Sequence, residues 1–216
     1  MRCKIQSMVR SILFCLLLFA GLSFSQQAAP PPAAAPAPDP NASGPGLYAI
    51  FDTSMGQIVA RLLEDKAPVT VKNFVDLATG AKESADASGT RMVKKRFYDG
   101  LTFHRVIKGF MIQTGDVNGT GGSKCGVDPI PDEISDMRFN VAGRLAMANL
   151  GRPDSANCQV FITVGPANHL NGTFTIFGVV SSGQDVADRI ASVPTFMDRP
   201  NTPVILNKVT IERRDH

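Results

Sequence analysis

The chain has 216 residues, of which 44% are hydrophobic, so it is long enough and apolar enough to fold around a core of its own. Its formal net charge is +3, but the first 25 residues contain three cations and no acidic residue. Subtracting these three from the 22 basic residues leaves 19, which equals the 19 acidic residues. This balance gives no support to nucleic acid or an anionic membrane as a partner, and we expect neither.

The first 25 residues have the pattern of a secretory signal peptide. Their cations precede an apolar run from Ile12 to Ala20, and Ser23 and Ser25 supply small residues at the cleavage-determining positions. The run is short for a bilayer span, so cleavage before Gln26 is favoured over a retained membrane anchor. We therefore expect an exported protein without a membrane segment after cleavage. The periplasm is the expected compartment, and full secretion is the alternative.

Residues 26–46 are rich in alanine and proline, and such a tract cannot bury a core. We expect a disordered, polyproline-like linker that tethers a single domain spanning residues 47–216. A docking motif for a proline-reading domain is the less favoured alternative.

The domain is predicted to be mostly β with two helices. Pro68 suits the first turn of a helix that runs to Thr79, Gly80 suits its C-terminal cap, and residues 183–193 form the second helix. Short strands separated by turn residues indicate a barrel, and a long glycine-rich loop covers residues 115–131. The expected strands are 48–53, 57–62, the extended pieces on either side of Gly109, 144–148, 159–163, 175–180 and 204–211.

One arginine lies in an otherwise apolar run. In an extended chain Arg105 points to one face, and its neighbours His104 and Val106 point to the other. Gly109 breaks the run, so a second strand, 110–113, is expected to return close to Arg105. A guanidinium offers five fixed donors and no proton to lose, so it can polarise an uncharged polar group but cannot act as a general base.

A second region combines small, amide and aromatic residues in the same way. Its motifs are Met147-Ala148-Asn149 and Gln159-Val160-Phe161-Ile162-Thr163. Together with residues 103–107 (FHRVI), residues 109–113 (GFMIQ) and Phe177-Gly178, they resemble the cyclophilin family of peptidyl-prolyl isomerases in order and spacing. The resemblance runs from about Leu47 to about Arg213. It implies a closed eight-stranded antiparallel β-barrel capped by two α-helices, which acts as a monomer without a cofactor.

The resemblance also implies roles for individual residues. Arg105 is the implied catalytic residue, which donates to the proline nitrogen. The apolar members of the site hold the proline ring, the two glutamines bind substrate carbonyls or orient Arg105, and the backbone of Asn149 pairs with the substrate backbone. The implied substrate-binding residues are Phe110, Met111, Gln113, Ala148, Asn149, Leu150, Gln159, Phe161, His169, Leu170 and Phe174.

Three of these residues depart from the common family pattern. His169 stands where many eukaryotic members have a tryptophan, and the chain has no tryptophan, so we expect weak binding of cyclosporin. Phe174 stands where many members have a histidine, although its ring can still pack against proline. Leu150 replaces a residue that is often alanine, and it is expected to narrow the groove.

Four cysteines are present, and Cys3 and Cys15 leave with the signal peptide. The remaining pair, Cys125 and Cys158, lies in loops that flank the same groove in the cyclophilin arrangement. A disulfide in an oxidising compartment and two separate free thiols are the two alternatives. No further ligands of the metal-binding type accompany these cysteines in the sequence, so we expect no zinc site.

The expected function is peptidyl-prolyl cis–trans isomerisation during the folding of exported proteins, with proline-containing and unfolded polypeptides as partners. The alternative is a non-catalytic module on the same fold that binds proline peptides or acts as a chaperone. Arg105 favours the enzyme, because a binder needs no donor to the proline nitrogen. A hydrolase is disfavoured, because the three histidines offer no convincing Ser-His-acid or Cys-His set.

Overall fold

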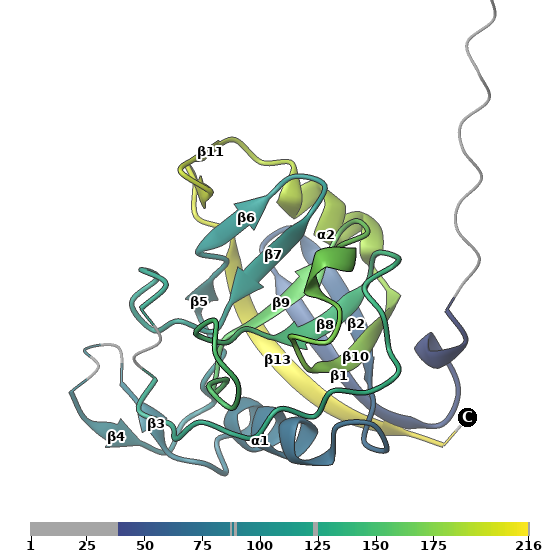
Figure 1. The fold of residues 1–216 in the computed structure, drawn as a ribbon. Helices are drawn as coiled ribbons and strands as arrows, with labels where there is room; N and C mark the ends of the chain where they lie inside the picture. Colours follow the sequence, from purple (N-terminus) through teal and green to yellow (C-terminus); the bar gives the residue numbers. More distant parts are fainter. Residues whose placement is uncertain (1–38, 87, 89, 123–124, 216) are drawn as a thin grey trace, which may run out of the picture. The chain divides into compact units, whose positions relative to one another are not determined.

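The computed structural model describes residues 39–86, 88, 90–122 and 125–215. The expected signal peptide and the first part of the expected linker lie outside these residues. Figure 1 shows a curled antiparallel sheet with α1 (Pro68–Thr79) and α2 (Gln184–Ala191) at opposite ends. Neither these helices nor any other in the described residues is long and apolar enough to cross a bilayer.

One antiparallel sheet of nine strands forms the body of the domain, in the order β5-β13-β1-β2-β10-β8-β9-β7-β6. Two small ladders, β3–β4 and β11–β12, lie outside it, as do the short 3-10 helices η1 (Pro40–Ala42) and η2 (Asn168–Leu170). The strands are β1 (Gly46–Thr53), β2 (Gly56–Leu62), β3 (Ser84–Ala85), β4 (Met92–Val93), β5 (Leu101–Thr102), β6 (Arg105–Ile107), β7 (Met111–Thr114), β8 (Arg144–Met147), β9 (Val160–Thr163), β10 (Ile176–Ser182), β11 (Thr195–Phe196), β12 (Arg199–Pro200) and β13 (Ile205–Arg214).

The strand count differs from the expected eight because one extended segment is interrupted. β5 pairs with β13 at one edge of the sheet, and β6 pairs with β7 at the other edge. Only Phe103 and His104 separate β5 from β6 along the chain. The two edges are therefore joined by a short piece of chain rather than by a ladder. The predicted mainly β fold with two helices is confirmed, and its barrel is a curled sheet of nine strands rather than eight.

The first helix, α1, begins and ends at the residues that the sequence predicts. Pro68 occupies the first turn, and Gly80 follows the last residue in the left-handed conformation, with φ of 81°. A Cβ atom on Gly80 would lie 2.8 Å from the backbone carbon of Lys95, so this position requires glycine for space as well as for conformation. Phe74 and Leu77 are fully buried on the inner side of the helix.

The two faces of the strands bury different groups of side chains. Val106, Ile112 and Ile162 belong to a large inner cluster, which includes the α1 residues Phe74 and Leu77. Their neighbours along the strands point to the opposite face, because side chains alternate along a strand. There they contribute to a smaller outer cluster made of Ala42, Leu63, Met111, Phe139, Ala146, Phe161, Ala167, Ile176 and Val179.

Residues 39–46 are part of the domain, which corrects the expected boundary at residue 47. Asp39 caps η1 and forms an ion pair with the buried Arg144, with 2.5 Å between Nη1 and Oδ2. Ala42 is buried in the outer cluster, and Gly46 already pairs with Arg214 in the sheet. Composition alone had assigned this stretch to the linker, because it has few apolar residues of its own; the ion pair with Arg144 anchors it.

Candidate active site

Four strands place a row of side chains on the outer face of the sheet. Arg105 on β6 lies opposite Gln113 on β7, Gln113 lies opposite Phe161 on β9, and Phe161 lies opposite Ala146 on β8. Directly opposite residues of an antiparallel pair have adjacent side chains on one face. The register therefore sets the guanidinium, an amide and an aromatic ring beside one another.

This row borders a groove with a cavity volume of about 180 Å³. Such a volume suits one ring-sized side chain rather than a large ligand. All of its lining residues were among the predicted site residues, namely Arg105, Phe110, Met111, Gln113, Ala148, Asn149, Phe161, Leu170 and Phe174.

The aromatic wall of the groove depends on a tight turn between β6 and β7. Phe110 donates its backbone N–H to the carbonyl of Ile107, and Gly109 has the positive φ of 72° that this turn requires. The turn brings the ring of Phe110 to 5.3 Å from the exposed His169 ring, measured between centroids. Across the groove, Phe174 packs edge-on against Phe161 at 5.7 Å. His169 thus supports a wall residue and is not itself among the lining residues.

The two glutamines act as a pair. Gln113 lines the groove and donates to Oε1 of Gln159 at 2.7 Å, and Gln159 is almost fully buried behind it. Gln159 also donates to the carbonyl of Gly121 at 3.4 Å, so it joins the groove to the 115–131 loop. The predicted role of Gln159 in orienting other groups fits this position better than direct contact with a substrate.

Leu150 does not take the place that was expected for it. Its side chain is 58% exposed, and it is not among the lining residues, so it does not narrow the groove. The Leu150 N–H donates to Oγ of Ser155, and the Asn149 side chain donates to the Thr173 carbonyl. These bonds turn the chain outward directly after Asn149.

Arg105 is half-exposed, with 47% of its side chain accessible, and its Nε lies 3.5 Å from Oδ2 of Asp198. Its two Nη atoms have no hydrogen-bond partner among the residues that the structure describes. Sequence reasoning missed Asp198, which lies 93 positions away in the chain. No local pattern links the two residues, because the contact depends on how the segment after α2 returns to β6.

The groups that could transfer a proton near Arg105 are held in other roles. His104 is buried, and this burial lowers its pKa, although the carboxylate of Asp116 opposes the shift. The ring is therefore neutral at pH 7. Asp116 accepts hydrogen bonds from the N–H groups of Thr120 and Gly121, both at 2.6 Å, so it caps the loop.

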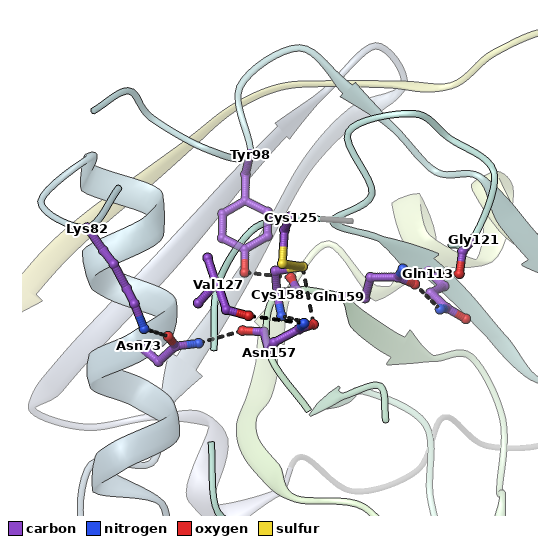
Figure 2. The surroundings of a disulfide bond; sticks show 10 residues. All are labelled: Asn73, Lys82, Tyr98, Gln113, Gly121, Cys125, Val127, Asn157, Cys158 and Gln159. Carbon is purple, nitrogen blue, oxygen red and sulfur yellow. Dashed lines mark hydrogen bonds between the residues drawn. A yellow bond between two sulfur atoms is a disulfide. The ribbon is translucent and has the colours of Figure 1, made fainter. Parts of the chain in front are cut away.

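A disulfide joins Cys125 to Cys158 behind the groove, with 6.5 Å between the Cα atoms. Figure 2 shows it between Tyr98, which donates to the carbonyl of Cys158 at 2.9 Å, and the Gln113–Gln159 pair. Gly115 also lies against this backbone, since a Cβ there would be 2.5 Å from the Cys158 carbonyl oxygen. The disulfide thus ties the 115–131 loop to the residue that precedes Gln159.

The site as a whole has an apolar pocket, amide groups and one guanidinium with free donors. Such a site can grip a neutral, ring-bearing peptide segment and place a cationic donor next to it. It belongs to the class of peptide-binding grooves on β-barrel-type domains, in which an arginine lies at the edge of an apolar pocket.

Comparisons with known proteins agree with this class. The sequence profile of the family described as "Cyclophilin type peptidyl-prolyl cis-trans isomerase/CLD" matches residues 48–211. Peptidyl-prolyl cis-trans isomerase B of Streptomyces anulatus is 45% identical over 174 residues, which cover 78% of this chain and 98% of that protein. Peptidyl-prolyl cis-trans isomerase A of Mycobacterium tuberculosis is 42% identical over 166 residues, covering 76% and 91%.

A comparison with solved structures also indicates the cyclophilin-type fold. A Cryptosporidium parvum cyclophilin-type isomerase, crystallised in the presence of the dipeptide Ala-Pro, matches with a TM-score of 0.65 and 28% identity. The match covers 77% of this chain and 99% of that one. The chain belongs to the cyclophilin-type peptidyl-prolyl cis-trans isomerase family.

Proposed function

We propose that this protein catalyses cis–trans isomerisation of X-Pro bonds in exported polypeptides while they fold. The observation that carries the proposal is the position of Arg105, which lines an apolar pocket of ring size and whose Nη groups have no hydrogen-bond partner among the described residues. Membership of the family and the names of its relatives support the reaction type.

The chemistry follows from the electronic structure of the amide. Rotation about an X-Pro bond must overcome a barrier of ~18–20 kcal/mol, because amide resonance is lost at the twisted state. The nitrogen then gains a lone pair that the planar ground state lacks. A donor aimed at this nitrogen stabilises the transition state more than the substrate, which is the condition for catalysis.

Each part of the groove has a task in this reaction. The pocket between Phe110, Met111 and Phe161 holds the proline ring, so that the rest of the peptide rotates against a fixed point. Gln113, held by Gln159, presents an amide to the substrate backbone beside Arg105. The reaction needs no nucleophile and no proton transfer, which agrees with a neutral, buried His104.

Two features support a role outside the cytoplasm. The basic and apolar N-terminal segment predicts export, and it lies outside the described residues. The Cys125–Cys158 disulfide is typical of proteins in oxidising compartments. Slow X-Pro isomerisation limits the folding of many chains, so an exported isomerase would act on polypeptides that arrive unfolded.

The reaction is tested with an Ala-Pro peptide in a protease-coupled assay, with wild-type protein and Arg105→Ala compared at equal concentration. Catalysis by the wild type that Arg105→Ala largely removes supports the proposal. A wild type that binds the peptide in an NMR titration without accelerating exchange would favour the alternative, a non-catalytic proline-binding or chaperone module.

The compartment is tested by N-terminal sequencing and thiol titration of protein isolated from cell fractions. The proposal expects a mature N-terminus at Gln26 and no free thiol at Cys125 or Cys158 under denaturing conditions. An uncleaved chain in which all four cysteines, Cys125 and Cys158 included, are free thiols would contradict export.

A further inference from the structure

A β-hairpin formed by residues 195–200, here called the 195–200 hairpin, lies beside the candidate catalytic arginine. It consists of β11 and β12, which pair Thr195 with Pro200 and Phe196 with Arg199, and Figure 1 shows β11 next to β6. The two residues of its turn, Met197 and Asp198, have positive φ angles of 50° and 64°. This is the backbone of a tight two-residue hairpin turn, in which asparagine, aspartate and glycine are favoured but methionine is not.

The hairpin is bonded to two neighbouring segments, β6 and the 115–131 loop. The carbonyl of Asp198 accepts a hydrogen bond of 2.7 Å from the backbone N–H of Val106, which is the residue after Arg105. In addition, Arg199 donates through Nη2 to the carbonyl of Gly119 at 2.6 Å, and so reaches the 115–131 loop. The turn is therefore placed by one backbone contact and one Arg199 side-chain contact, neither of which depends on the Asp198 side chain.

From this fixed position the Asp198 carboxylate meets Arg105 at Nε only, at 3.5 Å. A guanidinium held at Nε keeps both Nη groups available in a fixed plane. Arg105 lines the groove, and together with Asp198 it also lines a neighbouring hollow with a volume of about 310 Å³. The carboxylate thus contacts the arginine at Nε without itself lining the groove.

We propose that Asp198 is a positioning residue for Arg105 in the isomerase reaction. A half-exposed arginine has many rotamers, and ordering them costs entropy that must otherwise be lost when the transition state forms. The ion pair restricts these rotamers before the substrate binds. The inference rests on the proposed function, because it assumes that Arg105 acts on the X-Pro nitrogen.

The test compares Asp198→Asn with Asp185→Asn. Asparagine tolerates the left-handed backbone of the turn and keeps the bond to Val106, so the substitution removes the charge and little else. Asp185→Asn is the matched control, because it breaks an ion pair with Arg189 on α2, on a helix that contributes no residue to the groove. We expect Asp198→Asn to lower kcat about two- to fivefold with KM nearly unchanged, which is the scale of a half-exposed ion pair, and Asp185→Asn to have no effect.

A double variant decides whether the effect passes through Arg105. In the Arg105→Ala background, Asp198→Asn should cause no further loss, because the group that it positions is gone. An equal loss in both backgrounds, or an unchanged kcat in the single variant, would overturn the proposal. Asp198→Gly, which is also compatible with the turn, should reproduce the loss with an unchanged melting temperature; a full kcat in Asp198→Gly would also overturn the proposal.

A spectroscopic readout separates this inference from the proposed function. The Nε–Hε NMR signal of Arg105 should shift in Asp198→Asn and stay in place in Asp185→Asn. If the wild type is inactive, the proposed function fails, but this signal still reports whether Asp198 holds Arg105. An unmoved signal in Asp198→Asn would overturn the inference even in an active enzyme.

Discussion

Arg105 and Arg144 occupy similar places in the fold. Each is the first residue of a strand in the same sheet, β6 and β8, and each pairs with an aspartate from a peripheral segment of the domain. Their surroundings differ. Arg144 is only 6% exposed in its side chain, and it donates through Nη1 to Asp39 at 2.5 Å and through Nε to the carbonyl of Arg138 at 2.8 Å. Arg105 is 47% exposed and is held at one nitrogen.

The difference shows that an arginine can stabilise the fold in one environment and stay available to a substrate in another. A buried guanidinium must be surrounded by acceptors, because an unpaired buried charge is costly. Those acceptors use up the donors that catalysis would need. A guanidinium at the edge of a groove stays hydrated and keeps free donors for a substrate, and it contributes little to stability.

The largest expected effect concerns Arg105, the arginine of the pair that lines the groove. Arg105→Ala should lower kcat/KM about 10²–10³-fold, which is roughly 2.7–4 kcal/mol, the scale for losing one preorganised donor. The free energy of unfolding should change by less than about 0.5 kcal/mol, since the arginine is half-exposed. Urea unfolding and the coupled peptide assay measure the two quantities.

Arg105→Lys serves as the control for charge. It should also be a poor enzyme, because an ammonium on a flexible stem cannot reproduce the planar fork. Near-normal turnover in Arg105→Ala with an intact fold would remove Arg105 from the mechanism.

Asp39→Asn, which acts on the buried Arg144, should show the opposite pattern, a large loss of stability with little loss of turnover. Leaving Arg144 buried without its carboxylate should cost about 2–4 kcal/mol of unfolding free energy, somewhat below the range for a fully buried pair because Asp39 is partly exposed. Turnover of the folded protein should be nearly unchanged. Denaturant unfolding and activity at low temperature measure these effects.

Two truncated chains extend this test. A chain that begins at Asp39 should match the wild type in stability, whereas one that begins at Leu47 should be less stable than Asp39→Asn, because it also loses Ala42. Equal stability of the two truncated chains would restore the boundary at residue 47 that the sequence suggested.

A smaller effect is expected for the apolar wall beside Arg105. Phe110→Ala removes part of the ring pocket, so KM should rise and kcat/KM should fall about tenfold, as expected for roughly 1–2 kcal/mol of lost apolar contact. Binding should weaken together with turnover, unlike in Arg105→Ala. NMR titration with an Ala-Pro peptide separates the two cases. An unchanged binding constant would place the proline ring elsewhere.

The smallest expected effect concerns pH. Burial raises the pKa of Asp39, but the hydrogen bonds from Asn41 and Arg144 outweigh it, so the pKa lies below its usual value in the folded state. The ionised form therefore stabilises the fold above the unfolded pKa of about 3.9, and this stability is lost as the pH falls through the lower, folded value. The stability difference between wild type and Asp39→Asn should shrink as the pH is lowered from 6 to 3. A constant difference would show that the charge is not what matters.

Much of the local structure could be read from the chain. The ends of α1 follow from Pro68 and Gly80, because these residues restrict the backbone wherever they occur. Arg105 points outward and Val106 points inward because successive side chains alternate between the two faces of any strand. The residues that line the groove were also predicted, since the family resemblance carries their register.

The long-range partners of the arginines could not be read in the same way. Sequence determined which residues could act as donors, which could fill a pocket, and where α1 begins and ends, because these depend on the residue and its near neighbours. Only the tertiary structure decided that Asp39 meets Arg144, that Asp198 meets Arg105, and that Leu150 turns away from the groove. Such contacts depend on how segments far apart in the chain are packed together, and neither composition nor periodicity records that packing.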